Sequence, residues 1–80
     1  MNIKVLGPGC SNCINLENRT REALKQLNLN AQIEKVTDYS EILSYGLVRT
    51  PGLIINNKIV VQGSVPTVEQ LKDTIKQQLV

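Results

Sequence analysis

The strongest constraint on the fold is a change of apolar period early in the chain. Residues 3–6 read Ile-Lys-Val-Leu and end at the Gly-Pro-Gly of residues 7–9, which predicts a short strand entering a tight loop. From Cys13 onward, apolar residues recur every three or four positions, as in an amphipathic helix. Residues 31–36 predict a second strand, polar enough to lie at a sheet edge. Strand, helix and strand in this order predict a βαβ unit with a right-handed crossover.

A short helix is expected after this unit. Asp38 and Glu41 lie three residues apart, which is the spacing of a capping box, and Gly46 is placed as the stop of the helix. The expected apolar face of this helix consists of Tyr39, Ile42 and Leu43.

The last third of the chain predicts a hairpin and a final helix. Two apolar runs flank Asn56 and Asn57, and asparagine tolerates the positive φ of a two-residue hairpin turn. Thr67 and Gln70 have capping-box spacing at the start of the helix. Its expected buried stripe consists of Val68, Leu71, Ile75 and Leu79. The predicted order is therefore β-α-β-α-β-β-α, an α/β domain over residues 1–80.

The composition excludes several kinds of site. The chain has no histidine, which excludes an imidazole base and any histidine-containing zinc site. Nine basic and seven acidic residues are spread without a basic run, so no nucleic-acid partner is expected. The sequence shows no signal-peptide pattern and no apolar run of the roughly 18 residues a spanning helix needs, so we expect a cytoplasmic protein without a membrane partner.

Both cysteines lie in the tetrapeptide Cys10-Ser11-Asn12-Cys13, at the junction of the predicted strand and helix. Residues three apart on a helical turn lie about 5–6 Å from one another, which suits a disulfide. A bridge that closes so small a loop contributes little chain-entropy stabilisation. The pair is therefore interpreted as reactive rather than structural.

The two cysteines are expected to differ in reactivity. Cys10 should lie at the helix N-terminus, where the helix dipole lowers the pKa of its thiol and favours the thiolate. Cys13 lies one turn further along the same helix, among the apolar residues that are expected to face the core. We therefore assign Cys10 as the nucleophile that forms a mixed disulfide with a partner, and Cys13 as the group that resolves it.

Three alternatives remain open at this point. Two thiolates can bind a soft ion such as Cu(I), so the chain is alternatively a metal-binding or metal-transfer module. A structural zinc site would need two more ligands, and the chain has no third cysteine. The chain is otherwise a docking module with a passive disulfide, or the two thiols are simply neighbours in a small core. No cofactor is expected in any of these readings.

A family resemblance becomes visible at residues 45–51, which read YGLVRTP immediately before a strand pair. Together with the upstream CxxC, this segment resembles the thioredoxin superfamily, in particular the compact glutaredoxin-like redox proteins of archaea and bacteria. The resemblance implies a thiol–disulfide oxidoreductase with a four-stranded mixed sheet, the first strand central and helices on both faces. It also implies a cis peptide bond between Thr50 and Pro51, packed beside the cysteines.

The resemblance also implies where a substrate binds. Because proline has no N–H, the backbone of Thr50 before Pro51 is free to pair with an extended peptide. The expected substrate-binding residues are Gly9, Ser11, Asn12, Thr50 and Pro51. The expected partners are disulfide-containing proteins and an unidentified reductase as electron donor. Glutathione is less favoured, because residues 63–65 match poorly the loop that holds the tripeptide in relatives.

Two features of the surroundings complete these expectations. Many thioredoxins carry a carboxylate on the first strand that moves protons near the inner cysteine, whereas the matching position here is Lys4. An apolar surface around the thiols is expected from Gly7, Pro8, Gly9, Leu47, Val48, Pro51 and Val65. For Leu47 and Val48, burial in the core is an equally good interpretation.

Overall fold

The computed structural model describes residues 1–79. No helix within these residues is both long enough and apolar enough to cross a membrane. The elements follow the predicted order β-α-β-α-β-β-α. They are β1 (Asn2–Leu6), α1 (Ser11–Gln26), β2 (Gln32–Val36), α2 (Tyr39–Ser44), β3 (Gly52–Ile55), β4 (Lys58–Gln62) and α3 (Val68–Gln78).

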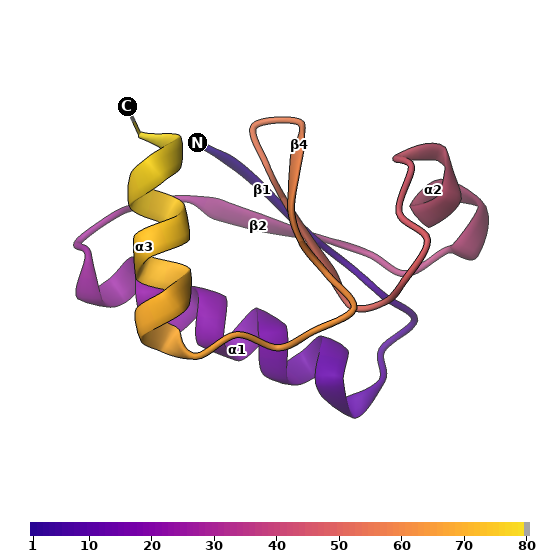
Figure 1. The fold of residues 1–80 in the computed structure, drawn as a ribbon, viewed down its shortest axis with the longest axis horizontal. Helices are drawn as coiled ribbons and strands as arrows, with labels where there is room; N and C mark the ends of the chain where they lie inside the picture. Colours follow the sequence, from indigo (N-terminus) through magenta and orange to yellow (C-terminus); the bar gives the residue numbers. More distant parts are fainter. Residues whose placement is uncertain (80) are drawn as a thin grey trace.

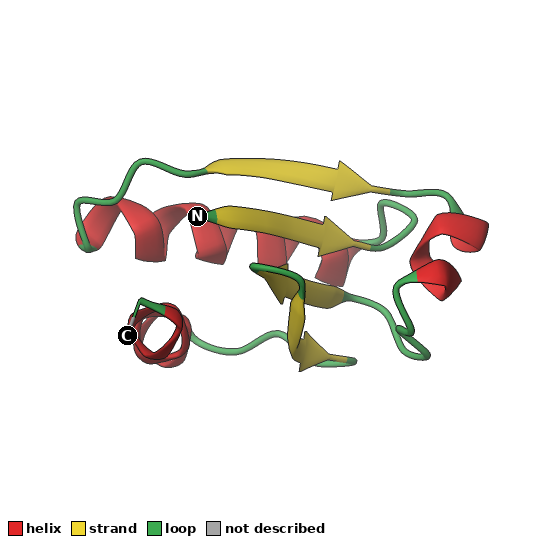
Figure 2. Cartoon of the chain, turned by 90° about the horizontal axis from the view of Figure 1, so that it is seen from above, coloured by secondary structure: helices red, strands yellow, loops and turns green. Residues whose placement is uncertain are grey.

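The four strands form one mixed sheet in the order β2-β1-β3-β4. β1 pairs in parallel with β2 and antiparallel with β3, and β3 pairs antiparallel with β4 (Figures 1 and 2). The expectation of a central first strand between the polar edge strand and the hairpin is therefore confirmed. Because β1 is central, its carboxyl end, where the cysteine loop begins, is held by neighbours on both sides.

Helices cover both faces of the sheet, as expected. α1 and α3 pack on one face, over a core that includes Ile3, Leu16, Leu53 and Leu71. α2 packs on the other face through Ile42, in a smaller cluster near the carboxyl end of β1. Figures 1 and 2 show α2 and α3 at opposite ends of the molecule.

The local signals read from the sequence give the expected turns and caps. Asn56 and Asn57 have φ values of 51° and 67°, as a two-residue hairpin turn requires. Gly46 ends the α2 region with a φ of 86°. Thr67 and Gln70 form a complete capping box at the start of α3. Each of these features depends on a few adjacent residues, which is why the sequence alone predicts it.

Three expectations about individual side chains are wrong. Asp38 caps α2, but its carboxylate accepts the N–H of Ser40 instead of forming a capping box with Glu41. In α2 only Ile42 is buried, and Tyr39 and Leu43 are 61% and 64% exposed. In α3 the buried stripe is Leu71 and Ile75, whereas Leu79 is 55% exposed because it lies beyond the helix end.

Candidate functional site

The two cysteines are joined by a disulfide at the start of α1, with their Cα atoms 5.0 Å apart. Cys10 is the N-cap of the helix, with extended backbone angles of −69° and 167°. The N–H of Cys13 donates to the Sγ of Cys10 at 3.2 Å, and the N–H of Ile14 donates to the carbonyl of Cys10 at 3.0 Å. The helix therefore begins where the sequence predicts, with one sulfur among its unpaired N–H groups.

The two sulfurs lie in different surroundings. Cys10 is exposed, whereas Cys13 is only 5% exposed and belongs to the buried stripe of α1. The first turn of α1 contains no acidic residue, so no carboxylate there opposes the positive end of the helix dipole at Cys10. An incoming group can reach Cys10 from solvent, while Cys13 is accessible mainly through its neighbour.

Gly7, at the end of β1, packs directly against the inner sulfur. A Cβ atom on Gly7 would collide with the Sγ of Cys13 and lie 3.1 Å from its Cβ. The N–H of Gly7 donates to the carbonyl of Val36 at 2.9 Å, so the backbone here is fixed to β2. From the sequence, Gly7 is expected in a tight loop and in an apolar surface around the thiols, and its contact with the inner sulfur becomes visible only in the structure.

The bond between Thr50 and Pro51 is cis, as the resemblance implies. Pro51 is buried, and its Cα lies 3.9 Å from the position that a Cβ on Gly7 would occupy. Pro51 and Cys13 therefore flank the same glycine, although they are far apart in the sequence. The fold brings the proline segment to the inner side of the disulfide.

The remaining residues predicted to bind a substrate surround the disulfide at different depths. Gly9, with a φ of 95°, lines a cavity beside Cys13. Ser11 and Asn12 are exposed on the first turn of α1, and Thr50 is half-buried. Their roles toward a substrate stay predictions.

The expected apolar surface around the thiols divides into core and exposed parts. Leu47 is 1% exposed and belongs to the core on the α2 side, whereas Val48 is 78% exposed. Gly7 and Pro51 are also buried, and Pro8 is exposed. The two interpretations left open by the sequence therefore apply to one residue each: Leu47 is core and Val48 is surface.

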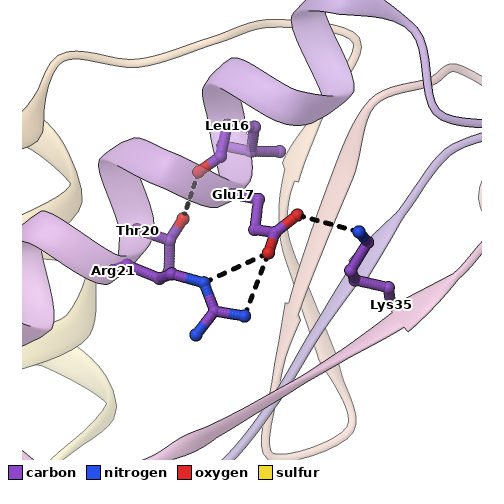
Figure 3. A network of polar contacts seen from close by, with 5 residues as sticks. All are labelled: Leu16, Glu17, Thr20, Arg21 and Lys35. Atoms are coloured by element: carbon purple, nitrogen blue, oxygen red, sulfur yellow. Dashed lines mark hydrogen bonds and ion pairs between the residues drawn. The ribbon is translucent and has the colours of Figure 1, made fainter.

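A small cavity of about 140 Å³ lies beside Cys13 and is bounded partly by Glu17 and Lys35. The carboxylate of Glu17 lies 3.5 Å from the Nζ of Lys35 on β2 and accepts two hydrogen bonds from Arg21, at 3.1 and 2.9 Å (Figure 3). Glu17 follows Cys13 by four residues, so the helical period places both on one side of α1. The spacing of four residues between Cys13 and Glu17 is visible in the sequence, although no role for Glu17 is predicted from it.

Lys4 lies away from the disulfide. Its Nζ stands 5.1 Å from the ring centroid of Tyr45, on the face of the sheet covered by α2. A cation at this distance over an aromatic ring is attracted to it. Lys4, at the strand position where the resemblance implies a carboxylate, therefore makes a contact between β1 and the end of α2.

Comparisons with known proteins agree with this geometry. A family model described as a thioredoxin domain matches residues 1–76. A curated thioredoxin of Methanothermobacter thermautotrophicus is 39% identical over 72 residues, covering 90% of this chain and 94% of the relative. A curated thioredoxin of Methanocaldococcus jannaschii is 36% identical over 77 residues, covering 96% of this chain and 88% of the relative.

Proposed function

The chain belongs to the thioredoxin family and is a thiol–disulfide oxidoreductase, and from this premise we propose that it reduces protein disulfides through Cys10 and Cys13. Cys10 is the attacking group and Cys13 the resolving group. The difference in exposure between the two sulfurs carries this assignment, because only Cys10 can meet a disulfide held in another protein.

The reaction proceeds in two exchanges from the dithiol form. The thiolate of Cys10 attacks one sulfur of the substrate disulfide; a mixed disulfide forms, and the other substrate sulfur leaves as a thiolate that takes up a proton. Cys13 then loses its proton and attacks the sulfur of Cys10. The intramolecular disulfide forms, the second substrate sulfur leaves, and the substrate has gained two electrons and two protons.

The short Cys10–Cys13 separation supports the second exchange. Their Cα atoms lie 5.0 Å apart, within the range that a disulfide spans without backbone movement. The resolving sulfur is therefore in place as soon as the mixed disulfide forms, and this proximity speeds the intramolecular step.

Thr50 and Pro51 complete the proposed substrate site together with Gly9, Ser11 and Asn12. Pro51 lies beside the glycine that contacts Cys13, so a chain paired with the backbone of Thr50 would pass close to the disulfide. The likeness to thioredoxins, together with the poor match of residues 63–65 to a glutathione-binding loop, supports protein disulfides over glutathione as substrates. A reductase that supplies two electrons must return the pair to the dithiol form, and we place the cycle in the cytoplasm, where thiols are kept reduced.

The soft-metal alternative finds no support in the family or in the two relatives. A docking module with a passive disulfide would not reduce a substrate repeatedly, so a measurement of catalytic turnover distinguishes it from an oxidoreductase. We therefore propose the redox function alone.

The test is reduction of insulin by catalytic amounts of the protein, with dithiothreitol as electron source. The wild type should accelerate precipitation of the insulin B chain, and Cys10→Ser should reduce the acceleration to the background of dithiothreitol alone. In a separate reaction, Cys13→Ser that has been reduced and then freed of dithiothreitol should accumulate a mixed disulfide with insulin, seen as a higher-mass species on a non-reducing gel. Wild-type protein without acceleration, or a trap that forms with Cys10→Ser instead, contradicts the proposal.

A further inference from the structure

Residues 47–51 connect α2 to β3 and lead the chain to the disulfide. Leu47 is 1% exposed and Pro51 is buried, so both ends of this segment are anchored in the core. Between them Val48 is 78% exposed, the most exposed of the large apolar side chains in residues 1–79. Val48 is three residues from Pro51, a distance of at most about 11 Å along an extended chain.

The segment lies directly on the sheet because β3 begins with a glycine. A Cβ on Gly52 would come within 2.5 Å of both methyl carbons of Leu47, so the leucine side chain occupies the space above this glycine. Gly52 pairs with Gln62 of β4, and directly paired residues direct their side chains to the same face. The side chain of Gln62 therefore lies on the face that carries Leu47, close enough to contact Val48, the residue after Leu47.

Two consecutive residues at the end of β4 hold the backbone of this segment. The N–H of Val48 donates to the Oε1 of Gln62 at 2.8 Å. The N–H of Gly63 donates to the carbonyl of Pro51 at 2.8 Å. The side chain of Arg49 packs across Gly63, where a Cβ would lie 3.1 Å from the Cβ and Cδ of the arginine. Of these contacts, only the one from Gln62 fixes the backbone at the exposed valine.

We propose that Gln62 is a positioning residue for protein substrates. It holds the backbone of Val48 so that the valine side chain contacts an apolar side chain next to the substrate disulfide. This inference rests on the proposed reduction of protein disulfides. A small disulfide has no flanking chain to reach Val48, so Gln62 discriminates between protein and small-molecule disulfides.

The test compares Gln62→Met with Gln62→Glu in single-turnover reactions. Methionine keeps the length of the side chain but replaces the amide oxygen with a thioether sulfur, which is only a weak acceptor, whereas glutamate keeps an acceptor oxygen. Pre-reduced protein is mixed with excess insulin or with bis(2-hydroxyethyl) disulfide, quenched by alkylation, and its oxidised fraction is measured by mass spectrometry. Gln32→Met, an exposed glutamine on the opposite edge strand β2, is the matched control.

With insulin, Gln62→Met should raise the half-saturating concentration about threefold to tenfold, as expected for the loss of one hydrogen bond. Its limiting rate, and its rate with the small disulfide, should stay within about twofold of the wild type. The lost contact stabilises the bound substrate and the transition state equally, so the chemical step itself is unchanged. Gln62→Glu should restore the wild-type half-saturating concentration, and Gln32→Met should match the wild type.

A double variant tests whether Gln62 acts through Val48. Val48→Ser alone should raise the half-saturating concentration for insulin. Gln62→Met combined with Val48→Ser should be no weaker than the weaker single variant, because both changes remove the same contact. Effects that multiply would overturn the inference.

The remaining outcomes separate the two proposals. Wild-type protein that is oxidised by the small disulfide but not by insulin overturns the proposed function. Wild-type protein that reacts with insulin, together with a Gln62→Met variant that matches it or loses both substrates equally, overturns the positioning role alone.

Discussion

Gly7 lies in direct contact with the Sγ of Cys13, with no room for a methyl group between them. The glycine ends the central strand and the cysteine lies on the first turn of α1, so the contact fixes the inner sulfur to the sheet. Backbone strain plays no part at this glycine, because its φ is not in the positive region. The requirement for glycine is purely one of space.

Gly7→Ala should therefore disturb the inner cysteine. The added methyl group overpacks a buried site, and we expect a loss of about 1–3 kcal/mol in the free energy of unfolding of the oxidised protein, measured in urea. The rate of insulin reduction should fall as well, because Cys13 is displaced from Cys10. Gly46→Ala is the control: its φ of 86° causes a backbone cost of about 1–2 kcal/mol, but a Cβ there meets nothing within 4 Å. A Gly7→Ala variant as active as Gly46→Ala contradicts the packing argument.

Alkylation should distinguish the two cysteines of the reduced protein. Cys10 is exposed at the helix N-terminus, and Cys13 is 5% exposed against Gly7. A brief exposure to iodoacetamide at neutral pH, followed by peptide mass spectrometry, should label Cys10 first. In unfolded protein the two should react at similar rates, which serves as the control. Label that appears first on Cys13 would reverse the assigned roles.

The capping box of α3 should contribute measurably to stability. The hydroxyl oxygen of Thr67 accepts a hydrogen bond from the backbone N–H of Gln70 at 3.1 Å. The side-chain Oε1 of Gln70 accepts one from the backbone N–H of Thr67 at 3.0 Å. Thr67→Ala removes the first bond and should lower the free energy of unfolding by about 1 kcal/mol. Thr67→Ser keeps the hydroxyl and should lose much less. Equal losses in the two variants would mean that the methyl group, not the cap, is responsible.

The charges around Glu17 should stabilise the contact between α1 and β2. Glu17→Gln leaves Lys35 without its counter-charge, and we expect a loss of less than about 1 kcal/mol, because both cations are more than half exposed. The loss should shrink between low and high NaCl concentration, since salt screens such pairs. Glu22→Gln, on the exposed side of α1, is the control. A loss independent of salt would indicate packing rather than charge.

Sequence and structure agree most closely where a feature depends on neighbouring residues. The Asn56-Asn57 turn, the cap at Thr67 and the start of α1 at Cys10 each follow from the conformational preferences and hydrogen bonds of a few adjacent groups. Such preferences act wherever the segment lies in the fold, and they can be predicted without knowing the tertiary structure.

Agreement is weaker where the question is which apolar side chains are buried. An apolar period shows which residues face one way, but the area of sheet available to them is a property of the whole fold. Tyr39 and Leu43 are exposed because α2 covers only a corner of the sheet. Leu47 and Val48 are adjacent and similar in character, yet only Leu47 is buried. Its side chain occupies the space that Gly52 leaves free because glycine has no side chain.

The sequence alone determined that Cys10 and Cys13 lie within reach of each other at the start of a helix, because a spacing of three residues on one turn sets that distance locally. The tertiary structure decided what surrounds them. Pro51 lies beside Gly7, and Gln62 accepts a hydrogen bond from Val48, and both are contacts between residues far apart in the chain. They arise only when the strands pair in one register, since strand pairing depends on all four strands at once.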